Sequence, residues 1–193
     1  MTITGTHDSA TGEKGKGFLS WLVTPFARTQ DKTVIAQYEA GARFFDFRFR
    51  RFDDGILRCA HGAWRSRKPL SLILEELAWQ SEEPIYVCLC WEGFASRDNE
   101  EEAIKVADGV YRFFSDLNSE SGAKRLHLID VSVKLPEWKV LKRYDTVDVQ
   151  GIHHCFKTLD FRSWHTLLPI PWLWHKLYRI KEREGYINSH DFL

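Results

Sequence analysis

The chain has 193 residues, of which 44% are hydrophobic and 28% are charged, a composition typical of a globular domain with a buried core. Its 27 basic residues are balanced by 27 acidic ones, so its charge gives no basis for binding nucleic acid. No apolar run approaches the roughly 20 residues that span a bilayer. The first residues show no signal-peptide pattern, which makes the cytoplasm the default expectation.

Periodicity predicts a regular order of elements in the first part of the chain. In chain order they are a short strand over 2–6, an irregular segment over 12–30, a helix over 32–42, a strand over 43–50 and a strand over 56–62. The helix is expected to end near Gly41, and "DDG" at 53–55 predicts a turn between the two later strands.

The same alternation continues to about residue 133. The predicted elements are a helix over 69–83, a buried strand over 84–92, a helix over 98–118 with Asn99 as its N-cap, and a strand over 125–133. Alternating strands and helices favour a parallel sheet or a (β/α) barrel. Beyond 134 the pattern weakens, with 147–156 compatible with a strand. The Trp-rich segment 164–183 suits either core packing or contact with a membrane interface.

Cysteine usage predicts neither zinc nor a disulfide framework. Cys88 and Cys90 form a CxC pair on one face of a predicted strand, and no CxxC pair occurs. We expect Cys59, Cys88, Cys90 and Cys155 to be small buried hydrophobes.

Chemically capable side chains stand where the predicted strands end. "THD" places His7 and Asp8 after the first strand, and "FDFRF" puts Asp46 and Arg48 on one face of the next. His61 and Glu92 end two further strands. In a parallel barrel the carboxyl ends of the strands meet at one mouth, so these residues are expected to converge.

Two histidines at one cavity can divide proton transfer, one accepting a proton and the other donating one. The guanidinium of Arg48 keeps its charge and suits phosphate oxygens. Asp8 and Asp46 would orient a histidine or the arginine. This combination predicts cleavage of a phosphodiester. Taken singly, His7 could instead cap a turn, Asp46 and Arg48 could form a structural ion pair, and Glu92 could hold only a backbone amide.

The stretches "ITGTHDSATG", "QYEAGARFFDFRFR" and "DDGILRCAHG", in this order, resemble the X-domain of the phosphatidylinositol-specific phospholipase C family, over residues 2–93. The resemblance implies a single domain over 1–193 with a distorted TIM-type (β/α) barrel. Residues 134–193 diverge, so the barrel either closes with fewer elements or is incomplete at its C-terminal end. The resemblance also implies a phosphodiesterase activity. Such an enzyme cleaves a phosphoinositide at a membrane surface to diacylglycerol and inositol (cyclic) phosphate.

The resemblance also assigns roles. His7 matches the general base, His61 the general acid, and Asp46 the acidic residue beside His61. Arg48 stands where calcium-dependent enzymes have a carboxylate, and Asp8 matches its partner. The implied enzyme therefore needs no metal or other cofactor, and it is expected to be a monomer without a transmembrane segment.

Other positions leave alternatives open. Glu92 and Lys68 are candidate substrate-binding residues. Glu92 lies where calcium-type enzymes keep an acid. Lys68 is expected, with Arg65 and Arg67, in a solvated loop, and contact with the headgroup is the alternative. No acidic partner for His7 can be assigned. A catalytically impaired domain that binds phosphoinositide headgroups or a protein partner is the rival hypothesis. A related metal-dependent glycerophosphodiesterase is a third, which Arg48 disfavours.

Overall fold

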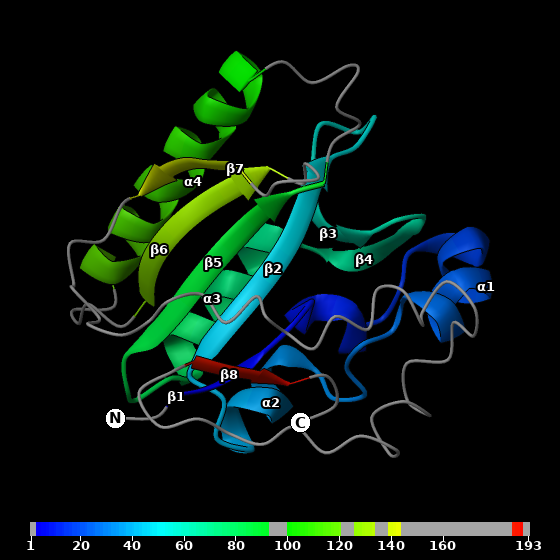
Figure 1. Ribbon diagram of the computed structural model, residues 1–193, viewed down its shortest axis with the longest axis horizontal. Helices are drawn as coiled ribbons and strands as arrows, with labels where there is room; N and C mark the ends of the chain where they lie inside the picture. Colours follow the sequence, from blue (N-terminus) through cyan, green and yellow to red (C-terminus); the bar gives the residue numbers. More distant parts are fainter. Residues whose placement is uncertain (1–2, 93–99, 121–125, 134–138, 144–186, 191–193) are drawn as a thin grey trace.

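Figure 1 shows the computed structural model, which describes residues 3–92, 100–120, 126–133, 139–143 and 187–190. The strands are β1 (Ile3–Thr6), β2 (Phe44–Arg51), β3 (Leu57–His61), β4 (Trp64–Pro69), β5 (Ile85–Trp91), β6 (Leu126–Val133), β7 (Lys139–Arg143) and β8 (Ile187–His190). The helices are the 3₁₀ turn η1 (Ser9–Gly12), α1 (Gly17–Ala27), α2 (Val34–Glu39), α3 (Leu70–Gln80) and α4 (Glu100–Glu120).

The eight strands form one mixed sheet with the order β4-β3-β2-β5-β6-β7, and β1 pairs with both β2 and β8. Strands β1, β2, β5, β6 and β8 are linked by parallel pairings. β3, β4 and β7 add antiparallel pairings at the two sides. β1 borders the start of β2, whereas β3 borders its end.

Side-chain alternation divides β2 and β5 between two environments. On one face, Phe45, Phe47, Phe49 and Leu89 join the main core, which α3 and α4 complete. Figure 1 shows α3 behind β2 and β5, and α4 beside β6 and β7. The other face carries the polar side chains Asp46 and Arg48, both buried. This face positions the candidate site.

Several sequence expectations are confirmed. Leu70, Ile73, Leu74 and Leu77 lie on the buried face of α3. Ala103, Ala107, Val110, Phe114 and Leu117 form the buried face of α4. Gly41 ends α2 with φ +103°, and Gly55 turns with φ +73°. Cys59, Cys88 and Cys90 are buried free thiols. Asn99, Cys155 and the segments 147–156 and 164–183 lie outside the described residues.

Other elements were missed. The segment 12–30 contains the helix α1. Most of its large apolar side chains are exposed, so they do not recur at the helical spacing that marks a face packed on the core. Residues 64–69 form β4 because they pair with β3, so Lys68 lies on a strand rather than in a loop. The strands β7 and β8 carry no strong alternation signal.

The fold class α/β is confirmed, but the described residues show no closed barrel. β3 runs antiparallel to β2 because only five residues, 52–56, connect them. A parallel crossover needs a dozen residues or more. The short "DDG" turn therefore produces a hairpin, and His61 reaches the site from a strand that runs back alongside β2.

Candidate active site

The His-Asp pair lies on a sharp turn directly after β1. Asp8 adopts a left-handed conformation with φ +45°, the only non-glycine residue with positive φ in the described chain. Such a backbone is unusual for a residue with a Cβ, although aspartate tolerates it better than most. Ser9 then enters η1, and its Oγ accepts a hydrogen bond from the Asp46 N–H at 2.9 Å. The turn is thereby tied to the middle of β2.

Neutral side chains from the α1–α2 region clamp this turn. Thr29 Oγ1 and Gln30 Nε2 each donate to the carbonyl oxygen of His7 at 3.1 Å. Gln37 Nε2 donates to the carbonyl oxygen of Ser9 at 2.7 Å. All three clamping side chains are buried, where unmade hydrogen bonds are costly. Sequence reasoning missed them because an isolated Thr or Gln carries no motif.

Arg48 lies at the centre of the site. Its Nε contacts Asp8 Oδ1 and lies 3.9 Å from Asp46 Oδ2. One terminal nitrogen, Nη2, contacts His7 Nε2, and the other, Nη1, lies 3.4 Å from Glu92 Oε1. The planar fork thus reaches three carboxylates and one imidazole at once, which a lysine could not do.

The second imidazole joins the cluster through Asp8. His61 Nδ1 lies 2.9 Å from Asp8 Oδ2, and His7 Nε2 lies 3.7 Å from the same oxygen. Glu92 Oε2 accepts a hydrogen bond from the Gly62 N–H at 3.0 Å. Glu92 therefore connects the residue after His61 to Arg48.

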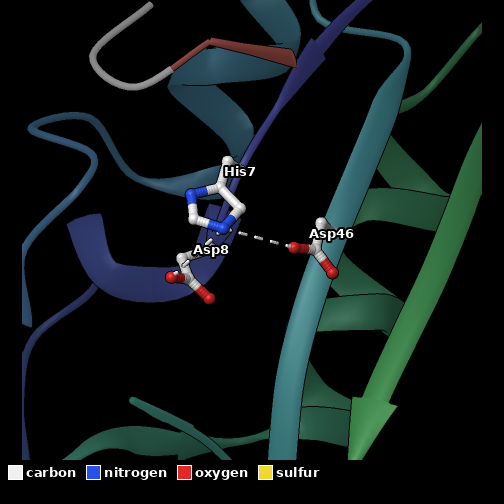
Figure 2. A group of neighbouring side chains, drawn as sticks. All are labelled: His7, Asp8 and Asp46. Carbon is white, nitrogen blue, oxygen red and sulfur yellow. Dashed lines mark ion pairs between the residues drawn. The ribbon is translucent and has the colours of Figure 1, made fainter. Parts of the chain in front are cut away.

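Exposure separates the charged groups from the imidazoles. The side chains of Asp8, Asp46, Arg48 and Glu92 are at most 6% exposed, whereas those of His7 and His61 are 19% and 27% exposed. A ligand from solvent therefore meets the two imidazoles first, with the guanidinium and the carboxylates beneath them. Figure 2 shows the His7 ring turned toward Asp46 above Asp8.

The pKa values of the two buried aspartates, Asp8 and Asp46, shift in opposite directions. Burial raises the pKa of Asp8, but the positive charges of Arg48, His61 and His7 lower it by more, so it lies well below its usual 3.8. Burial raises the pKa of Asp46 above 3.8, and the negative charge of Asp8 adds to the rise. Asp8 is therefore the ionised partner of Arg48, and Asp46 holds a proton more readily. Such a split is common where acid–base chemistry occurs.

The partners of the two aspartates differ from the expectation. The resemblance placed Asp46 beside His61, whereas the structure puts Asp8 there and leaves Asp46 4.0 Å from His7 Nε2. The expected contact of Asp8 with Arg48 is present. Asp8 thus serves both Arg48 and His61, because its left-handed backbone directs the carboxylate between them.

Two further positions bear on the site. Lys68, on β4, does not join the cluster: its Nζ lies 2.5 Å from Glu76 and 3.7 Å from Glu13. Cys90 is in register with Arg48 on the neighbouring strand. Burial, and then the charge of Asp46, raise the pKa of the Cys90 thiol, so it stays neutral. The sequence did carry a signal for this position. In "CLC" (88–90) and "DFR" (46–48) the first and last residues share a face of their strands, so Cys90 could have been expected beside Arg48 once the two strands were paired.

By spacing, one ligand atom each from His7, Asp8 and Asp46 could share a metal ion, because these atoms lie within 4.8 Å of one another. Arg48 approaches all three residues. A divalent cation at this point would be repelled by the guanidinium, and calcium prefers six to eight oxygen ligands. The donor set therefore fits the arginine better than it fits a metal.

No family model and no curated protein matches the sequence. Among solved structures, a variant of the phosphatidylinositol-specific phospholipase C from Staphylococcus aureus is similar, with 20% identity, a TM-score of 0.48, and coverage of 66% of this chain and 46% of its own. The corresponding enzyme from Listeria monocytogenes has 23% identity, a TM-score of 0.46, and coverage of 66% and 49%. The chain thus spans about half the length of these enzymes, which belong to the family that its sequence resembles.

Proposed function

We propose that the chain is a metal-independent phosphodiesterase of the phosphatidylinositol phospholipase C type. One observation carries this proposal: two partly exposed imidazoles, His7 and His61, share Asp8 beside the buried guanidinium of Arg48. Acid–base transfer needs two groups close to one reacting centre. Phosphate needs a fixed positive charge, which a guanidinium supplies.

The proposed reaction divides the work among these groups. His7 Nε2 accepts the proton of an inositol hydroxyl, whose oxygen attacks phosphorus. Arg48 holds the phosphate oxygens. The bond from phosphorus to the glycerol oxygen breaks, and that oxygen takes a proton from His61. Because Asp8 faces His61 Nδ1, Nε2 is the atom that would deliver this proton. The products are diacylglycerol and a cyclic inositol phosphate.

A second feature suits a lipid substrate. Helix α1 exposes five large apolar side chains at 52–74% of their surface: Phe18, Leu19, Trp21, Leu22 and Phe26. It lies beside β4 at the periphery of the sheet (Figure 1), anchored by a hydrogen bond from the Arg65 N–H to Ser20 Oγ at 3.1 Å. Apolar patches of this kind mark interaction sites, including interfaces with membranes. No described helix is both long and apolar enough to cross a bilayer.

The test is release of water-soluble inositol phosphate from phosphatidylinositol vesicles, with and without EDTA. We expect cleavage that EDTA leaves unchanged. His7→Ala and His61→Ala should each lower the rate roughly 10²–10⁴-fold, the usual contribution of a general acid or base. Circular dichroism should show both variants folded.

A matched control is His127→Gln, because His127 stacks on Tyr86, with ring centroids 5.4 Å apart, rather than on the cluster. Its activity should stay within a few-fold of the parent. Full activity of His61→Ala would refute the mechanism. Saturable headgroup binding without turnover, even at high protein concentration, would favour the binding domain instead.

A further inference from the structure

A cavity of about 360 Å³ lies away from the catalytic cluster, between α3, α4 and the β2–β3 turn. Arg51 and Leu57, which pair across β2 and β3, both line it. Because Arg51 is an odd number of residues from Arg48, its side chain belongs to the opposite face of β2. The cavity is therefore separate from the candidate active site, and its volume falls in the range of small-molecule sites.

The lining is apolar on both sides and basic at its edge. Leu57, Leu70 and Leu74 face Val106, Val110 and Phe113 of α4. The charged residues that line it are Arg51 and Lys105, and no carboxylate is among the lining residues. Apolar walls with two cations fit a ligand that has a hydrocarbon chain and a negative head.

Gly109 is the second observation that points to a ligand. It lines the cavity in the interior of the 21-residue helix α4, and a Cβ added there would meet no atom within 4 Å. Glycine inside a helix costs roughly 0.5–1 kcal/mol relative to alanine. No packing contact requires glycine at this position, whereas a large side chain would project into the cavity.

We propose that this cavity binds a medium-chain fatty acid, with its chain between α3 and α4 and its carboxylate between Arg51 and Lys105. The two cations already have partners: Arg51 Nη1 lies 3.3 Å from Glu102, and Lys105 Nζ lies 2.7 Å from Glu101. Both pairs are exposed to solvent, where such ion pairs contribute little. A ligand carboxylate can therefore replace the glutamates at small cost.

The probe is laurate, titrated calorimetrically into the full chain below its micelle concentration. We expect saturable binding of one laurate, with 1-dodecanol weaker and dodecyltrimethylammonium weaker still. Gly109→Phe, which fills the cavity, should weaken laurate binding about tenfold or more. Gly109→Ala is the matched control and should bind close to the parent.

Charge variants keep the proposal falsifiable if Gly109→Phe misfolds. Lys105→Glu and Arg51→Gln should each weaken laurate binding about 2- to 5-fold, as expected for exposed ion pairs. Trp21→Ala should leave it unchanged, which separates the cavity from α1. The proposal fails if the cationic amphiphile binds as tightly as laurate, if these variants change nothing, or if laurate only alters the oligomeric state. The readout is binding, so loss of phospholipase activity would not affect it.

Discussion

Asp8 connects the arginine and the two histidines of the candidate site. Its carboxylate contacts Arg48 and His61 and lies near His7, and its backbone has the left-handed conformation that directs it there. It is almost fully buried, so its negative charge depends on these positive partners. Removing either side of such a buried pair leaves an uncompensated charge.

This arrangement predicts how stability responds to acid. The pKa of Asp8 in the folded protein lies below its usual 3.8, so ionised Asp8 stabilises the fold above about pH 4, and this contribution is lost as the pH falls further. It is on the order of 2 kcal/mol. In Asp8→Asn the free energy of unfolding should therefore depend less on pH between 5 and 2, as measured by urea denaturation.

Asp46→Asn is the matched control. The raised pKa of Asp46 favours the folded state at low pH and opposes it at higher pH. Removing Asp46 should therefore leave the acid-side loss of stability in place. An equally steep acid-side loss in Asp8→Asn would contradict the assignment of Asp8 as the ionised partner of Arg48.

At the scale of elements, two segments with unlike roles flank the site. The clamp of Thr29, Gln30 and Gln37 fixes the His7–Asp8 turn from inside. Helix α1 instead packs against β4 and keeps its large apolar side chains in solvent. Because α1 is not part of the turn, we expect substitutions of its exposed side chains to alter binding to a lipid surface rather than the proposed chemistry.

We expect Trp21→Ala to weaken binding to phosphatidylinositol vesicles roughly tenfold or more, since burying a large apolar side chain in lipid contributes about 1.5–3 kcal/mol. Sedimentation with the vesicles measures this directly. Trp79→Ala is the matched control, because Trp79 is 61% exposed, like Trp21 at 69%, but belongs to α3. Equal losses in both variants would show that α1 has no special part in adhesion.

At the scale of the whole molecule, the sheet joins distant parts of the chain. β1 lies between β2 and β8, and Ile3 is in register with Ile187. Figure 1 shows the two short strands side by side below β2. His7 and Asp8 follow β1 directly, so the site depends on a strand that residues near the other end of the chain support.

Deleting residues 187–193 should therefore lower the Tm by roughly 5 °C or more, because β1 loses its hydrogen bonds to β8. Phosphodiesterase activity should fall with it, since the His7–Asp8 turn loses support. Deletion of 191–193 alone removes no described strand and should leave both quantities near the parent's. Scanning calorimetry and the vesicle assay measure them. Equal effects of the two deletions would rule out this role of β8.

Local patterns predicted the central elements well. Aromatic and charged alternation indicated β2, the apolar run indicated β5, and the helical period indicated α3 and α4. The errors have physical causes. α1 has no core-facing stripe, and β4 exists because β3 supplies its partner. Alternation of strands and helices favoured a parallel sheet or a barrel; the described sheet is mixed instead, because the five-residue turn before β3 permits only a hairpin.

The sequence by itself determined which chemical groups are present: two histidines, an arginine and acidic residues on the strands or directly after them, since these follow from residue type and short-range period. Only the tertiary structure decided which acid faces which imidazole, because those distances depend on the left-handed turn at Asp8 and on the direction of β3. The contact of Glu92 with Arg48 is likewise a property of packing, since β2 and β5 become neighbours only when the sheet forms, whereas Asp46 shares the strand and the face of Arg48 as alternation predicted.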